Sequence, residues 1–130
     1  MLKLKDSEIH LWHVDQAEFD ATELEEKCID WLTTIESERY QRYTFDHHRK
    51  QFLLGRMLIL KTLSQYAQIS PKEWKFVEND YGKPAIDNSQ QECGLFFNLS
   101  HSGDRLVLAV AGNEALGVDI ESSNKARRVV

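Results

Sequence analysis

The sequence predicts an α+β fold in which an antiparallel sheet packs on a long helix. One strand-like stretch comes first, helical spacing fills the middle, and several strand-like stretches joined by short turns follow. A doubly wound parallel sheet would instead alternate strands with helices along the chain. With 130 residues, 42% hydrophobic and 28% charged, the chain suits one domain with an ordinary core.

The first strand is predicted at residues 9–14, IHLWHV. Side chains alternate along a strand, so Leu11 and His13 share one face while His10, Trp12 and Val14 share the other.

A helix is predicted to open at Thr22, where Thr22–Glu25 has the pattern of a capping box. Apolar residues at helical spacing predict one buried stripe: Leu24, Cys28, Trp31, Leu32 and Ile35. The acidic residues between them are most simply a solvated face.

The long helix is predicted from about Asp46 to Ala67, with Ser37 as another candidate helix start. Its apolar stripe is broad enough to pack under a sheet. The stripe consists of Phe52, Leu53, Met57, Ile59, Leu60, Leu63, Ser64 and Ala67, and Arg49, Lys50, Arg56 and Lys61 occupy the remainder.

After Pro71 the pattern changes to short strands and turns. Strands are predicted at 74–77, 95–100, 105–111 and 117–121, with loops or turns at 79–84, 87–92, 102–104 and 112–114. The stretch 105–111 is apolar on both faces, so we expect it to be central in the sheet.

Charge is unevenly distributed around the net value of −5. Residues 39–75 carry 8 bases and 2 acids, whereas residues 1–38 carry 11 acids and 3 bases, and residues 76–130 carry 8 acids and 5 bases. The basic middle third is either a solvated helix face or a site for a small polyanionic ligand. Nucleic acid is a weaker candidate, because the field of the whole chain is negative.

Cys28 and Cys93 could pair, but two free thiols fit better, and no Cys/His spacing resembles a zinc site. The first residues have no apolar run typical of a signal peptide, and no later run is long enough to span a membrane. We therefore expect a cytoplasmic protein that does not bind a membrane.

Asp119 and Glu121 give the sharpest chemical signal. In a strand they would point out of the same face, and two such carboxylates could hold one hard cation such as Mg²⁺, with Mn²⁺ as an alternative. The competing interpretation is a pair of solvated acids on an edge strand.

Two further stretches could contact a ligand. Gly82-Lys83-Pro84 places an ammonium group in a loop, and Ser100-His101 ends a strand where it could meet a phosphate. A Ser–His nucleophile pair is disfavoured, since neighbouring residues in an extended chain do not aim at each other. The other histidines, His10, His13, His47 and His48, are expected to be surface or packing residues.

The motifs GKP, NLSHSG and GVDIE, in this order and at this spacing, closely resemble those of the 4′-phosphopantetheinyl transferases of the large, surfactin-synthetase-activating type. The basic stretches 38–43 and 48–56 are similar to that family's helical segment. The resemblance extends from about residue 35 onward.

The resemblance implies transfer of the phosphopantetheine arm of coenzyme A to a serine of an apo acyl or peptidyl carrier protein. It assigns the metal to Asp119 and Glu121, and nucleotide phosphates to Ser100 and His101. It assigns the adenine end of coenzyme A to Gly82, Lys83 and Pro84. Gln51 stands where the family often has arginine, so Arg49 or Lys50 would substitute as a contact to the 3′-phosphate.

The resemblance also implies one half of a two-half fold, because the family's W-x-x-K-E-A motif lies well downstream of GVDIE. We expect residues 1–121 to form an N-terminal subdomain and 122–130 to begin a linker to a C-terminal half. The chain would then be a weakly active or inactive half of a Mg²⁺-dependent transferase. The alternative is a non-catalytic fragment that binds coenzyme A or a nucleotide, or that self-associates as a homodimer through an exposed face.

Overall fold

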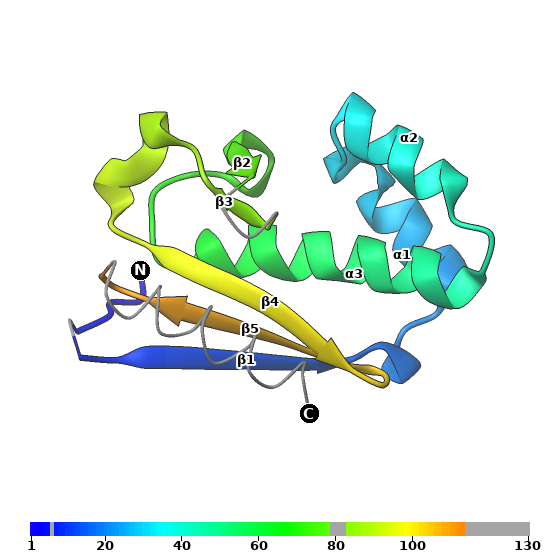
Figure 1. The fold of residues 1–130 in the computed structure, drawn as a ribbon, viewed down its shortest axis with the longest axis horizontal. Helices are drawn as coiled ribbons and strands as arrows, with labels where there is room; N and C mark the ends of the chain where they lie inside the picture. The colour runs from blue at the N-terminus through cyan, green and yellow to red at the C-terminus, as the bar shows by residue number, and fades with distance from the viewer. Residues whose placement is uncertain (6, 79–82, 114–130) are drawn as a thin grey trace.

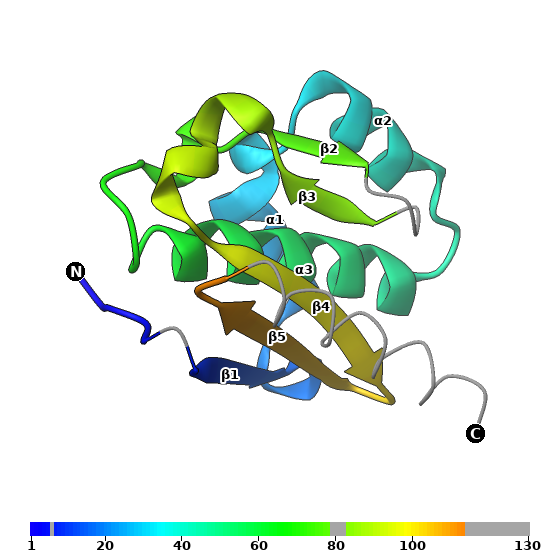
Figure 2. The ribbon, with the colours of Figure 1, turned by 60° about the vertical axis from the view of Figure 1, so that its left-hand side comes forward.

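The computed structural model describes residues 1–5, 7–78 and 83–113, and these form an α+β arrangement with antiparallel sheets, as predicted. The elements are β1 (Ile9–Asp15), α1 (Ala21–Cys28), α2 (Thr34–Arg42), α3 (Asp46–Leu63), β2 (Phe76–Glu78), β3 (Pro84–Ile86), β4 (Phe96–Ser102) and β5 (Arg105–Ala111). A three-stranded sheet lies against α3, and α1, α2 and the β2–β3 pair lie beyond that helix (Figures 1 and 2).

The main sheet has the order β1-β5-β4, with both pairs antiparallel. The apolar strand β5 is therefore central, which confirms the prediction made from its two apolar faces. Leu108 of β5 pairs with Trp12 on one side and Leu99 on the other. The turn between β4 and β5 contains Gly103, whose φ of 59° is a left-handed conformation that glycine adopts without strain.

The core lies between the sheet and α3. Helical spacing brings Leu53, Leu54, Ile59, Leu60 and Leu63 of α3 inward, where they are buried with Leu106, Leu108 and Val110 of β5. Gly55 permits a close approach to β4, because a methyl group there would lie 3.0 Å from Leu99 Cδ2. The long helix ends at Leu63 rather than at Ala67.

The first helix differs from its prediction. Thr22 does not open it: Asp20 is the N-cap of α1, and its carboxylate accepts a hydrogen bond from the Glu23 backbone N–H at 3.0 Å. The capping box of this region belongs to α2, between Thr33 and Glu36. A carboxylate accepts the exposed N–H groups of a first turn as well as a hydroxyl does, so sequence pattern alone did not separate these starts.

The predicted stripe over residues 24–35 is interrupted. Leu24 and Cys28 are buried, but α1 ends at Cys28, a 3₁₀ turn follows at Ile29–Trp31, and Ile35 is 74% exposed. After this turn Leu32 and Thr33 are extended, so helical spacing no longer places later residues on one face.

Smaller differences occur after α3. The short strand is Phe76–Glu78 instead of 74–77, and the polar stretch predicted as a loop forms a 3₁₀ helix, Asn88–Cys93. The predicted strand 117–121 lies outside the described residues, as does Glu114 of the predicted turn.

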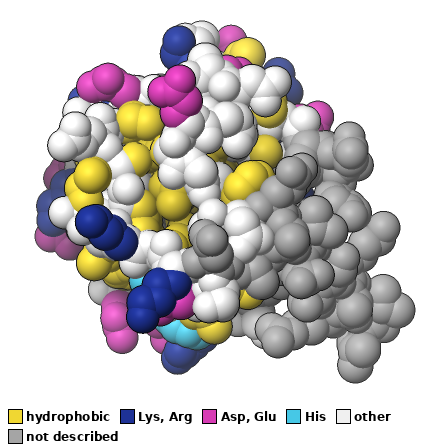
Figure 3. Space-filling view, turned by 90° about the vertical axis from the view of Figure 1, so that its left-hand side faces the viewer, with side chains coloured by type: hydrophobic (Ala, Val, Ile, Leu, Met, Phe, Trp, Pro, Cys, Tyr) yellow, Lys and Arg dark blue, Asp and Glu magenta, His cyan; other side chains and the backbone are white. Residues whose placement is uncertain are grey.

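Hydrophobic side chains also reach the surface. Figure 3 shows them gathered in the middle of one end of the molecule, with charged side chains towards its rim. Cys28 and Cys93 are both free, as predicted. Among the described helices, none combines the length and apolar composition that crossing a membrane requires.

Candidate functional site

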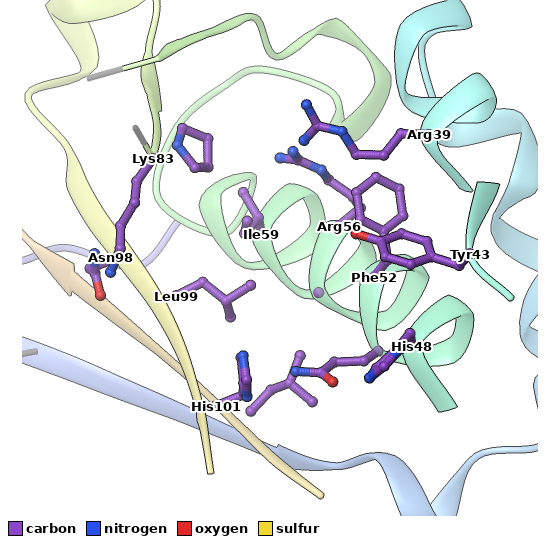
Figure 4. Close-up of a pocket in the computed structure, with 14 residues that line it drawn as sticks. Arg39, Tyr43, His48, Phe52, Arg56, Ile59, Lys83, Asn98, Leu99 and His101 are labelled. Carbon is purple, nitrogen blue, oxygen red and sulfur yellow. The ribbon is translucent and has the colours of Figure 1, made fainter. Parts of the chain in front are cut away.

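A cleft of about 540 Å³ lies between β4 and the start of β3 on one side and α2 and α3 on the other. We call these two sides the sheet wall and the helix wall. The cleft is lined by Arg39, Tyr43, His48, Gln51, Phe52, Gly55, Arg56, Ile59, Lys83, Pro84, Asn98, Leu99, His101 and Leu106. Figure 4 shows these side chains facing one another across the gap.

The sheet wall combines a loop with a strand. Lys83 precedes β3, and its side chain runs towards Asn98 of β4 (Figure 4). Because side chains alternate along β4, Leu99 and His101 share the face that looks onto α3, and His101 lies near the end of the strand. The sheet wall therefore presents an ammonium group from the residue before β3 and an imidazole from the paired strand β4.

The helix wall is built by spacing on α3. His48, Phe52 and Arg56 follow one another at intervals of one helical turn, so they share a face. Tyr43 packs against this face, with ring centroids 5.6 Å from Phe52 and 6.3 Å from His48. The Arg56 guanidinium carbon lies 5.5 Å from the centroid of Phe52, and Arg39 joins from α2.

The charge of the cleft is positive. Arg39, Arg56 and Lys83 line it, and none of its described lining residues is acidic. Arg56 is anchored by Glu36, whose Oε2 lies 2.7 Å from Arg56 Nε. Burial lowers the pKa of Arg56, with Glu36 opposing the shift, but a guanidinium remains charged at neutral pH. Such a lining suits a ligand with several negative charges.

Three predicted site residues meet in this cleft: Lys83, Pro84 and His101. Ser100 is not among the residues that line it. Gly82, Asp119 and Glu121 lie outside the described residues, so their assignments stay predictions.

The two predicted contacts on α3 do not line the cleft either. Arg49 turns towards α2, where its Nη2 donates to Gln41 Oε1 at 3.2 Å and its guanidinium carbon lies 5.0 Å from the Tyr40 ring centroid. Lys50 is half-buried outside the cleft lining. In the part of the chain that the structure describes, no three His, Cys, Asp or Glu side chains could together hold a metal ion.

Sequence reasoning missed most of the helix wall. The basic composition of residues 39–75 indicated a polyanion site, but it did not single out Arg39, Arg56 or the rings between them. His48 lines the cleft, whereas His47 packs beside buried Gln16, with Nδ1 3.0 Å from Gln16 Nε2. Helical periodicity from residue 48 to residue 56 was the available signal.

A second cleft of about 640 Å³ adjoins the first and shares Arg39, Arg56 and Pro84 with it. Its other lining residues include three aromatic side chains, Trp31, Trp74 and Phe76, and two basic ones, Lys72 and Lys75. The two arginines therefore stand on the boundary between the clefts.

Comparison with known proteins matches residues 12–113 to a family model described as 4′-phosphopantetheinyl transferase, N-terminal. The chain is 34% identical over 122 residues to the 4′-phosphopantetheinyl transferase HetI of Nostoc sp., a match that covers 92% of this chain and 50% of HetI. It is 28% identical to the 4′-phosphopantetheinyl transferase Sfp of Bacillus subtilis, over 75% of this chain and 42% of Sfp. The chain thus spans half or less of the length of these relatives.

The fold also resembles a solved structure. Helicobacter pylori holo-[acyl-carrier-protein] synthase, crystallised in complex with coenzyme A, superposes with a TM-score of 0.55 over 80% of this chain and 98% of that one. At 13% sequence identity this likeness concerns the fold alone.

Proposed function

The chain belongs to the 4′-phosphopantetheinyl transferase family, and from this premise we propose that its cleft binds coenzyme A for transfer of the phosphopantetheine arm to a serine of an apo carrier protein. The observation that carries the proposal is the cleft itself. It gathers two arginines, a lysine and two histidines among apolar lining residues, without an acidic lining residue among those described. Coenzyme A offers the complementary groups, a 3′-phosphate and a pyrophosphate beside a planar base.

The two walls suggest how the ligand lies. We assign the 3′-phosphate to His101 and the adenine end to Lys83 and Pro84, together with Gly82. Arg39 and Arg56 face this position from the helix wall and supply further charge for the phosphates.

The proposed metal is Mg²⁺, with Mn²⁺ as an alternative. The donor chemistry of Asp119 and Glu121 fits, because both offer the hard carboxylate oxygens that these ions prefer. When bound, the cation would neutralise negative charge on the pyrophosphate. This chain would supply two carboxylates that lie two positions apart in the sequence.

We propose further that residues 1–121 form the N-terminal subdomain of a larger cytoplasmic enzyme, and that residues 122–130 begin the linker that follows. The match to an N-terminal family model and the shared half of HetI support this. A third metal carboxylate would come from the C-terminal half, so this chain alone should turn over slowly or not at all.

Calorimetry with coenzyme A and with 3′,5′-ADP tests the binding proposal. Wild-type protein should bind both, and Lys83→Ala and His101→Ala should each weaken binding about tenfold, as expected for loss of a charge-assisted contact. Lys27→Ala, an exposed lysine of α1 outside the cleft, is the matched control and should bind as wild type does. Absence of binding in the wild-type chain would overturn the proposal.

An assay with coenzyme A, Mg²⁺ and an apo carrier protein tests the second half of the proposal. Robust turnover by this chain would contradict its incompleteness. Nucleotide binding without turnover fits both the incomplete transferase and the alternative of a binding fragment. Adding the C-terminal half of a relative separates them, because only an incomplete transferase should then regain activity. Light scattering at high protein concentration tests the predicted homodimer.

A further inference from the structure

Helix α2 carries Arg39 but has little core of its own. It is nine residues long, and Tyr40 is its single buried residue. A helix this short is not stable by itself in water, so contacts with the rest of the protein must fix its position. Those contacts therefore decide where Arg39 stands in the cleft.

Two arginines of α3 hold α2, one near each end. Arg49 donates to Gln41 and lies over Tyr40 at the C-terminal end, while Arg56 pairs with Glu36 at the N-terminal end. Arg49 and Arg56 are two helical turns apart, so they project from the same face of α3. The two helices are thus fastened at two points, in addition to the apolar cluster that Tyr40 shares with Leu53 and Leu54 of α3.

Glu36 uses its two carboxylate oxygens for two purposes. Oε1 accepts a hydrogen bond from the Thr33 backbone N–H at 3.0 Å, which closes the capping box, and Oε2 lies 2.7 Å from Arg56 Nε. The side chains of Arg56 and Glu36 are 16% and 20% exposed, so solvent screens the pair only partly. One carboxylate therefore both starts α2 and ties its first turn to α3.

Arg39 follows Glu36 by three residues, about one turn further along the same helix face. Figure 4 shows the Arg39 and Arg56 guanidinium groups side by side at the top of the cleft. Glu36 itself does not line that cleft; it faces the adjoining one. Its effect on a ligand in the first cleft must then pass through the two arginines.

From this geometry we propose that Glu36 is a positioning residue, which through its pair with Arg56 holds the Arg39 guanidinium over the nucleotide cleft. The proposal rests on the proposed function for its ligand, 3′,5′-ADP or coenzyme A. Arg56 shares the task, but because it also lines the cleft, Glu36 is the residue that isolates positioning from direct contact.

A double-mutant cycle tests this. Glu36→Gln keeps an oxygen for the Thr33 N–H but removes the charge that attracts Arg56, and it should weaken 3′,5′-ADP binding about threefold to tenfold. Arg39→Ala should weaken binding at least as much. In the Arg39→Ala background, Glu36→Gln should have a much smaller effect than in wild type, since the main group that it positions is gone and only Arg56 still connects it to the cleft.

Glu38→Gln is the matched control: it makes the same change of charge on an exposed acid of α2 and should leave binding unchanged. A general loss of stability would lower affinity regardless of Arg39, and the loss of a negative charge would by itself favour an anionic ligand. Additive effects of Glu36→Gln and Arg39→Ala, or an unchanged affinity in Glu36→Gln, would therefore overturn the proposal.

A second readout does not depend on the ligand. The side-chain NMR signal of Arg39 Nε–Hε should show greater motion in Glu36→Gln than in wild type or Glu38→Gln. If the wild-type chain binds no nucleotide, the proposed function fails, and this measurement alone decides the positioning role. An Arg39 signal unchanged by Glu36→Gln would overturn it.

Discussion

The two walls of the cleft are built on different principles. The sheet wall rests on β4, which is paired along its length with β5 and backed by buried residues such as Phe97 and Leu108. The helix wall includes α2, which carries Arg39 and is held by one buried tyrosine, a capping box and two arginine contacts from α3. The sheet wall is fixed by backbone pairing and core packing, whereas the α2 part of the helix wall is fixed by a few side chains.

The difference separates two kinds of sensitivity. A polar substitution on the surface of β4 leaves the strand in place, because its backbone hydrogen bonds do not depend on side-chain identity. A single polar substitution in α2 can move the whole helix. Substitutions in α2 should therefore change mainly ligand affinity, and substitutions in the sheet and the core beneath it should change mainly stability.

The largest effect should come from the support of the sheet wall. Leu108→Ala removes a fully buried side chain of the central strand and should lower the free energy of unfolding by about 2–5 kcal/mol. Urea denaturation measures it. The same change at Leu11, which is 58% exposed on β1, should cost well under half as much, and equal losses would contradict the assigned core.

The next largest effect on stability should come from the contact between α3 and β4. Gly55→Ala places a methyl group 3.0 Å from Leu99 Cδ2, and overpacking costs about 1–3 kcal/mol against a gain in helix propensity of about 1 kcal/mol. We expect a net loss of stability. Truncating Leu99 to alanine in the Gly55→Ala protein should relieve the contact. The loss of unfolding free energy in the double variant should therefore be smaller than the sum of the losses in Gly55→Ala and Leu99→Ala. If Gly55→Ala were more stable than wild type, β4 would have moved away from the added methyl group at little energetic cost.

On the helix wall, Thr33→Ala removes the hydroxyl that accepts the Glu36 N–H at 3.2 Å. Loss of such a cap costs about 1 kcal/mol of unfolding free energy, measured by thermal or urea denaturation. Thr34→Ala changes the exposed neighbour and should stay within about 0.5 kcal/mol of wild type. Equal values for the two variants would mean that the capping box does not hold α2.

The smallest effect should appear only at alkaline pH. Burial raises the pKa of Tyr40 under the helix wall and of Tyr66 beside the sheet. A raised pKa favours the neutral phenol in the folded state, so this stabilisation is complete below the ordinary tyrosine pKa of about 10 and is lost as pH rises through the folded values. Unfolding free energies between pH 8 and 11 should fall less steeply in Tyr66→Phe than in wild type. Identical slopes would contradict the assignment of the loss to Tyr66.

The sequence predicted the elements whose signal is local. The stripe of α3 and the two apolar faces of β5 placed the long helix and the central strand, and the GKP and NLSHSG motifs placed Lys83, Pro84 and His101 in one site. The helix and the strand were predicted from residues that lie close together or repeat with a fixed period, and the shared site was predicted from the resemblance of the motifs to those of a known family.

The rest depended on how separate elements pack. Whether Arg39, Arg49 or Arg56 faces the ligand depends on how α2 sits on α3, and helical spacing alone does not contain that information. The interruption of the helix after Cys28 similarly left Ile35 in solvent. Contacts between helices joined by short turns are decided by packing, after local preferences are satisfied.

The strand order β1-β5-β4 has a consequence for folding during synthesis on the ribosome. Ile9 pairs with Ala111, so the first strand finds its partner only when nearly all of the described chain has been made. At a synthesis rate of about 5–20 residues per second, β1 waits on the order of 10 s with an unpaired edge. The helices can form during this interval, but the sheet closes last, because its sequence-distant pairing carries the larger loop-closure cost. Ribosome-bound chains that stop before β5 should therefore be the form of this protein most in need of a chaperone.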